Sequence, residues 1–159
     1  MSLQKFFQWC YQSPVLGILR DSSYAMPIIQ SIHLLGLTIL LGTTVMLNLR
    51  LLGIGMRQLP LSDVAQQLWP WAFGALLLMI SSGILVFIPD PVRYVNSGPF
   101  QLKMALLALA ILYHFTIFRR VTRKKLSPRS PLVNAIVAFF SLTLWFSVGW
   151  AARAIAFFK

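Results

Sequence analysis

Apolar residues dominate four long stretches of the chain, and polar residues gather in the short segments between them. The stretches cover about residues 27–49, 65–88, 102–118 and 132–157. A helix needs about 20 apolar residues to cross the ~30 Å hydrocarbon layer of a bilayer, and most of these stretches reach that length. The pattern predicts an all-α protein, a bundle of four transmembrane helices. Because the connections are short, neighbouring helices should run up and down alternately.

The first 25 residues carry a different pattern. On a helical wheel one side holds apolar residues and the other polar ones, namely Leu3, Phe6, Phe7 and Cys10 against Gln4, Lys5, Gln8 and Gln12. This arrangement predicts an amphipathic helical segment over residues 1–25 that lies in the membrane interface. A loosely ordered tail is the alternative. We expect residues 1–159 to form a single membrane domain.

Proline and serine mark the predicted helix ends. Ser62 is expected to cap the second helix, and Pro89 and Pro91 to end it, because proline cannot continue the backbone hydrogen bonds. The pair Ser130-Pro131 should open the fourth helix, with a capping hydroxyl followed by proline in the first turn.

Composition supports the membrane interpretation. The chain is 58% hydrophobic and 11% charged, which is more apolar surface than a soluble domain of 159 residues can bury. The net charge is +11, but the basic residues flank the apolar stretches, where anionic lipid headgroups are their natural partners. We therefore expect no nucleic-acid binding. Cys10 is the single cysteine, so an intrachain disulfide and a thiolate metal cluster are excluded.

The basic residues also predict an orientation. Eight of the fourteen Lys and Arg fall in the loops 50–63 and 119–131, and short cytoplasmic loops carry such an excess. These two loops should be cytoplasmic, and both termini should lie outside. The expected location is a bacterial inner membrane.

Polar side chains within the first stretch fall on one side of a helix. Gln30, His33, Thr44 and Asn48 lie within about 60° of one another at 100° per residue, so this stripe should point into the bundle. His33 also begins an H-x-x-G pattern that ends at Gly36. The other histidine, His114, lies in the third stretch, near its basic end.

Imidazole is a metal ligand and a common axial ligand of haem b, and we predict that His33 ligates such a cofactor. His33 and His114 would differ in depth by ~10–18 Å at ~1.5 Å per residue, which disfavours one haem held between them. The second ligand would be Met104, Met79 or no protein group. Lys103 or Arg20 would neutralise the propionates.

Structural roles are the alternative for several of these residues. Either histidine could simply bond to a neighbouring helix, and this interpretation is stronger for His114. Arg50 could pair with Asp63, one of only three acidic residues, or extend to lipid phosphate.

Several short segments occur in an order that resembles an uncharacterised family of bacterial four-helix membrane proteins. They are Leu19-Arg20-Asp21-Ser22, Ser31-Ile32-His33-Leu34-Leu35-Gly36, Asn48-Leu49-Arg50-Leu51-Leu52-Gly53, Pro70-Trp71 and Phe100-Gln101-Leu102-Lys103. The resemblance implies the bundle and the bacterial membrane, and it draws attention to His33, Arg50 and Lys103. Family members often carry Asp where this chain has Asn48, and His114 has no counterpart in the pattern.

No catalytic constellation accompanies these residues, since the chain has no carboxylate pair within reach, no nucleophile beside a base and no glycine-rich phosphate loop. We therefore expect a non-enzymatic protein. The first hypothesis is a small bundle that binds haem b and passes electrons to quinone or a partner protein. The alternatives are a cofactor-free accessory or anchor subunit of a larger membrane complex and a metal-ion handling protein, which could act as a homo-oligomer.

Overall fold

The structure is a computed structural model that describes residues 22–55, 58–123 and 130–155. Within these ranges the chain forms helices and no strands. The predicted segment 1–25 lies almost wholly outside the described residues, and so does Arg20.

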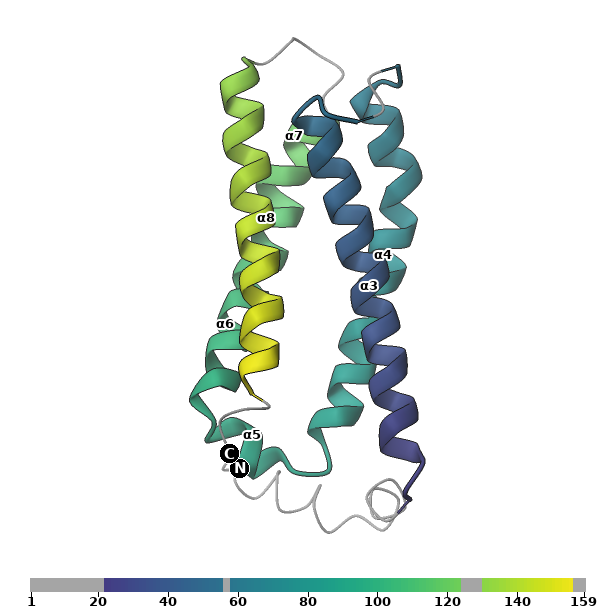
Figure 1. Cartoon of the computed structure of the whole chain (residues 1–159), viewed down its shortest axis with the longest axis vertical. Helices are drawn as coiled ribbons and strands as arrows, with labels where there is room; N and C mark the ends of the chain where they lie inside the picture. Colours follow the sequence, from purple (N-terminus) through teal and green to yellow (C-terminus); the bar gives the residue numbers. More distant parts are fainter. Residues whose placement is uncertain (1–21, 56–57, 124–129, 156–159) are drawn as a thin grey trace.

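Four long rods make up the bundle (Figure 1). The first two are α3 (Ala25–Leu51) and α4 (Leu61–Phe87). The third consists of α6 (Gly98–Tyr113), η1 (His114–Phe118) and α7 (Arg119–Arg123), which follow one another without a break. The fourth is α8 (Pro131–Ala154). The all-α, up-and-down prediction is confirmed, and each end of a predicted stretch lies within about five residues of an observed helix end.

The helix ends follow the local sequence in part. The Ser130 hydroxyl accepts a hydrogen bond from the backbone N–H of Val133 at 3.4 Å, which confirms the predicted start of α8. The prediction for Ser62 was wrong, because α4 begins one residue earlier and its N-cap is Pro60. A short helix that the sequence pattern missed, α5 (Pro91–Val95), crosses between α4 and α6.

The helices pack as two pairs, and each pair contacts the other mainly at one end of the bundle. Helix α3 packs mainly against α4, and α6 mainly against α8, while α3 also contacts α8. Helix α4 reaches the third rod chiefly at α7. The pairs therefore lie closest at the α7 end and diverge toward α5, as Figure 1 shows.

Buried polar bonds join these helices. Asn48 on α3, which is fully buried, donates through Nδ2 to the Ser141 hydroxyl on α8 at 3.1 Å. The Tyr113 hydroxyl on α6 donates to the Val137 carbonyl on α8 at 2.9 Å. Such bonds fix the rotation of helices that have little hydrophobic driving force between them in lipid.

The inward stripe predicted for α3 is only partly observed. Thr44 and Asn48 are buried and His33 is half-buried, but Gln30 is exposed. Gln30 lies in the second turn of α3, at the end of the bundle where the helix pairs diverge (Figure 1), so the prediction for Gln30 was wrong.

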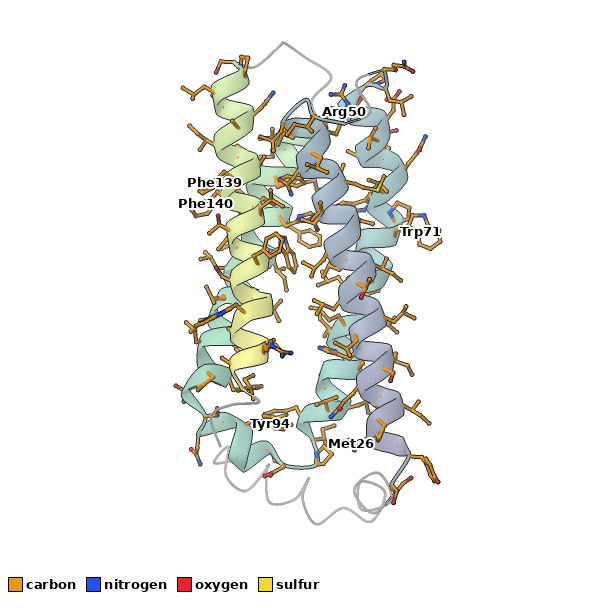
Figure 2. All side chains as sticks on the ribbon, viewed as in Figure 1. Met26, Arg50, Trp71, Tyr94, Phe139 and Phe140 are labelled. Atoms are coloured by element: carbon orange, nitrogen blue, oxygen red, sulfur yellow. The ribbon has the colours of Figure 1, made fainter. Side chains whose placement is uncertain are left out.

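The outer surface is apolar. Trp71 points outward from α4, and Phe139 and Phe140 point outward from α8 (Figure 2). Trp71 is 65% exposed and Phe139 73% exposed. Exposure of such large apolar side chains is unfavourable in water and favourable in lipid. All four rods are long and apolar enough to cross a membrane.

Candidate functional site

The candidate site lies in the half of the bundle that ends at α5, and its centre is His33 on α3. The Nδ1 atom of His33 is 3.0 Å from the hydroxyl oxygen of Ser82 on α4. The Ser82 hydroxyl donates its own proton to the Leu78 carbonyl at 2.5 Å. With its proton directed to Leu78 the oxygen accepts, which favours the His33 tautomer that carries its proton on Nδ1 and donates it to Ser82.

This bond leaves the other ring nitrogen with a lone pair. The His33 ring also has a hydrogen bond with the backbone of Met79. An imidazole with a lone pair on Nε2 is the form that coordinates metal ions. Ligating histidines usually donate their second ring N–H to such a fixed acceptor.

Two glycines make room for the ring and for the close helix contact beneath it. A Cβ atom at Gly83 would lie 3.3 Å from Cε1 of His33, so the imidazole rests on the bare backbone of α4. A Cβ atom at Gly36 would lie 3.3 Å from both the Ala75 carbonyl oxygen and the Met79 backbone nitrogen. The H-x-x-G pattern therefore places a polar side chain one turn away from a close backbone contact between α3 and α4.

A cavity of about 320 Å³ opens beside His33, between the two helix pairs. It could hold roughly 20 water molecules at the ~15 Å³ that each requires, and it falls within the ~300–1,000 Å³ typical of ligand pockets. Its walls are almost entirely apolar, and its polar side chains are His33 and Lys103. The lining residues are His33, Leu37, Met79, Ile80, Gly83, Ile84, Phe87, Phe100, Lys103, Met104, Leu107, Val148, Gly149 and Ala152.

The two sulfur-bearing side chains occupy different walls. Met79 belongs to α4, three residues before Ser82, and so lies on the same wall as His33. Met104 belongs to α6, on the facing wall, next to Lys103. Of the two methionines named from the sequence, Met104 is therefore the one placed to approach a ligand from the side opposite His33.

Aromatic rings close the α5 end of the cavity. Phe87 and Phe100 stack with ring centroids 5.5 Å apart, and Tyr94 on α5 contacts both rings. Figure 2 labels Tyr94 at this end of the bundle. The Gln101 side-chain amide donates to the Val95 carbonyl at 2.8 Å and so ties α5 to α6. The short helix thus gives the cavity a fixed end.

His114 lies elsewhere, in the half of the bundle that ends at α7. It is 5% exposed and surrounded by Trp69, Phe115, Phe118 and Trp145. It does not line the cavity beside His33. The two histidines are therefore not brought together, in agreement with the difference in depth inferred from the sequence.

The remaining residues named from the sequence hold the scaffold. Arg50 donates through Nε and Nη2 to the Leu59 carbonyl at 2.9 and 2.6 Å, and not to Asp63. The carboxylate of Asp63 instead accepts from the Ser62 hydroxyl at 3.0 Å. The hypothesis of an Arg50–Asp63 pair was wrong, because each side chain bonds to a different partner.

Ser82 and the aromatic residues at the α5 end were not identified as site residues from the sequence. The segment Ser81-Ser82-Gly83 did carry a signal, because small residues in an apolar helix mark a close contact. Nothing in the spacing indicated that this contact would receive His33. Within the described part of the chain, no group of three or more His, Cys, Asp or Glu side chains is placed to hold a metal ion.

The fold, the apolar outer surface and the four long rods define a multi-pass helical membrane protein with a cavity between its helix pairs. Residues 6–158 match the model of the family of unknown function DUF6644, and the chain belongs to that family. This agrees with the resemblance to an uncharacterised family seen in the sequence. No curated protein and no solved structure matches the chain.

Proposed function

We propose that this protein binds haem b, or a similar flat redox cofactor, in the cavity between its helix pairs, with Nε2 of His33 as an axial ligand. The observation that carries the proposal is the hydrogen bond from His33 to Ser82. It orients the ring beside a large apolar cavity and favours the tautomer that keeps a lone pair on Nε2.

The cavity suits such a cofactor in three respects. Its volume of about 320 Å³ lies within the range of ligand pockets, and its apolar walls favour a macrocycle. Lys103 supplies a positive charge on the wall of α6 for a propionate. Met104 on that same wall could provide a second ligand, since a thioether is a known axial partner of histidine.

In this proposal the protein holds and tunes the cofactor. A bound haem would supply one-electron chemistry. His33 would set its position, the apolar walls would exclude water, and Lys103 would balance the propionate charge. Following the predicted orientation, the cavity would lie in the outer half of a bacterial inner membrane. Quinone in the bilayer or a partner protein would exchange electrons with the site.

An absorption spectrum of the detergent-purified protein, oxidised and then reduced with dithionite, tests the proposal. The expected result is a Soret band and a sharpened α band on reduction, both lost in His33→Ala and retained in His114→Phe. The second variant is a matched control because it removes the other histidine from an aromatic environment. A protein that is folded, expressed with ample haem and colourless would contradict the proposal.

The second candidate is a cofactor-free accessory subunit of a membrane complex. The same contacts favour it, because the His33–Ser82 bond and the close approach at Gly36 fasten α3 to α4 without any ligand. A stoichiometric partner that co-purifies equally with the native protein and with His33→Ala would select this candidate. A partner together with a His33-dependent spectrum would select the haem protein instead.

A further inference from the structure

A second cavity, of about 100 Å³, lies in the half of the bundle that ends at α7, between α4 and the third rod. It is separate from the cavity beside His33 and has no role in the proposed function. Four polar side chains contribute to its walls, and none of its lining residues is acidic. The lining residues are Leu47, Ala65, Gln66, Trp69, His114, Phe118, Arg119 and Thr122.

The guanidinium group of Arg119 is held in place at this cavity. Its Cζ atom lies 4.1 Å from the centroid of the Trp69 ring, a cation–π contact that orients the planar group. Its Nε atom is buried and has no hydrogen-bond partner. A buried guanidinium N–H without an acceptor is destabilising, because it has lost its hydrogen bond to water and no protein acceptor replaces that bond.

His114 lies in the same wall and is almost fully buried. It is 5% exposed, and its ring stacks between Trp69 and Phe118, at centroid distances of 6.2 and 5.0 Å. Its Nδ1 atom is buried without a partner. The residue begins η1, a short π-helix within the third rod. Such π-helical segments occur frequently at functional sites.

The guanidinium group of Arg119 brings hydrogen-bond donors to the wall of this cavity, which suits a ligand that accepts hydrogen bonds. The guanidinium charge and the absence of acidic lining residues indicate that this ligand is an anion. Gln66 is exposed and adds an amide donor on the wall of α4. The volume of about 100 Å³ would hold roughly seven water-sized probes at ~15 Å³ each, which suits a group the size of phosphate.

We propose that this cavity binds a phosphate oxyanion. The guanidinium of Arg119 and the amide of Gln66 would donate to its oxygens. The Trp69 ring, which lies against the guanidinium, and the neighbouring His114 would hold Arg119 in place for this contact.

The depth of the cavity fits the phosphate level of a bilayer. Helix α4 has 27 residues, about 40 Å at ~1.5 Å per residue, and so exceeds the ~30 Å hydrocarbon layer by about 5 Å at each end. Gln66 lies five residues into α4, and Arg119 lies three residues before Thr122, the end of the third span. Both are therefore close to the boundary between hydrocarbon and headgroups. Basic pockets between helices at this level are known to hold anionic lipid headgroups.

The oxyanion could belong to a phospholipid headgroup or be free phosphate, and the experiment separates the two sources. Native mass spectrometry of the full-length protein in detergent would count retained phosphatidylglycerol relative to phosphatidylcholine. Calorimetric titration with inorganic phosphate, on protein in phosphatidylcholine nanodiscs, would measure the free ion. Arg119→Gln is compared with Arg120→Gln, which changes the net charge equally at an exposed position outside the cavity.

We expect one tightly held phosphatidylglycerol per chain in the native protein and in Arg120→Gln. Arg119→Gln should weaken this binding by about tenfold or more, the usual effect of losing a charged hydrogen bond. Binding of inorganic phosphate that Arg119→Gln alone removes would assign the same site to the free ion. Equal binding by the two arginine variants, or no binding of either probe to the native protein, would overturn the proposal.

A second pair of variants tests the proposal even if Arg119→Gln does not fold. Gln66→Leu removes a donor from the cavity, whereas Gln67→Leu makes the same change on the next exposed residue of α4, outside the cavity. The first should weaken binding of the phosphate-bearing probe several-fold and the second should not. Equal effects of the two glutamine variants would also overturn the proposal.

Discussion

The Nδ1 atom of His33 and the hydroxyl oxygen of Ser82 lie 3.0 Å apart across the contact between α3 and α4. Because Ser82 in turn donates to the Leu78 carbonyl, the two residues form a directed chain of hydrogen bonds that starts at the imidazole. The chain orients His33 and favours the tautomer that is protonated on Nδ1. The site therefore depends on a residue of α4 as much as on the histidine itself.

Ser82→Ala should weaken cofactor binding by about tenfold to a hundredfold, as is usual when a ligating histidine loses the acceptor that orients it. The variant should cost only about 0.6 kcal/mol of stability, and at most about 1.7 kcal/mol, since interhelical hydrogen bonds in membranes have that range. Titration of apo-protein with haem, followed at the Soret band, measures the first effect. Thermal unfolding in detergent measures the second.

Ser81→Ala is the matched control for this variant. Ser81 is exposed and donates to the Leu78 carbonyl of its own helix, at 3.1 Å. The control should leave haem binding unchanged. Equal haem affinities for Ser81→Ala and Ser82→Ala would show that the bond to His33 does not support ligation.

Lys103→Gln should weaken the binding of haem b by about tenfold to a hundredfold, because a charge-assisted hydrogen bond to a propionate would be lost. The same variant should bind haem dimethyl ester as well as the native protein does, because the ester has no propionate charge. Spectroscopic titration with both compounds makes this comparison. An equal loss for haem and its ester would instead indicate that Lys103 only shapes the cavity.

Gly36→Ala should destabilise the bundle by about 1–3 kcal/mol, the usual cost of forcing an added methyl into a packed contact. The added Cβ would lie 3.3 Å from two backbone atoms of α4, and backbone cannot move aside as a flexible side chain can. Thermal unfolding with and without haem would measure the loss.

Gly42→Ala provides the comparison on the same helix, since nothing lies within 4 Å of its added Cβ. It should be neutral or stabilise the helix by up to about 1 kcal/mol, the difference in helix propensity between glycine and alanine. If the two glycine variants had the same stability, the close approach at Gly36 would not limit the packing of α3 on α4.

The sequence was sufficient for the long elements because lipid imposes a simple rule on them. A helix must be apolar over its full span, so the four stretches were visible without any knowledge of packing. The start of α8 was equally local, since the cap at Ser130 needs only its own first turn. The short helix α5 was missed because five residues carry too little periodic pattern.

The site was predicted less completely, because a partner on another helix depends on how far each helix is rotated. His33 stood out as a polar residue in an apolar stretch, but its bond to Ser82 needs the close approach that Gly36 and Gly83 permit. The sequence pattern also did not predict the short π-helix η1 that begins at His114. This π-helix brings Tyr113 and Phe118, five residues apart, into the buried interior together, which the regular α-helical period does not predict.

Asn48→Asp should destabilise the protein by about 3–5 kcal/mol, the range found when a buried charge is left without its partner. Asn48 is fully buried, and its Nδ2 atom donates to the Thr44 carbonyl at 2.8 Å and to the Ser141 hydroxyl at 3.1 Å. A carboxylate would lose both of these donations and would bury a negative charge at the contact between α3 and α8.

Asn48→Leu should cost less than Asn48→Asp, because it removes the amide oxygen that has no partner along with the donor. Unfolding by heat or by denaturing detergent, compared among the native protein and the two variants, measures the order. An Asn48→Asp variant as stable as the native protein would mean that the carboxyl is protonated or that a cation reaches this position. In the second case Arg50, two residues further along α3, would have to leave the Leu59 carbonyl that it binds. Adding Arg50→Gln to Asn48→Asp would expose that exchange by a further loss of stability.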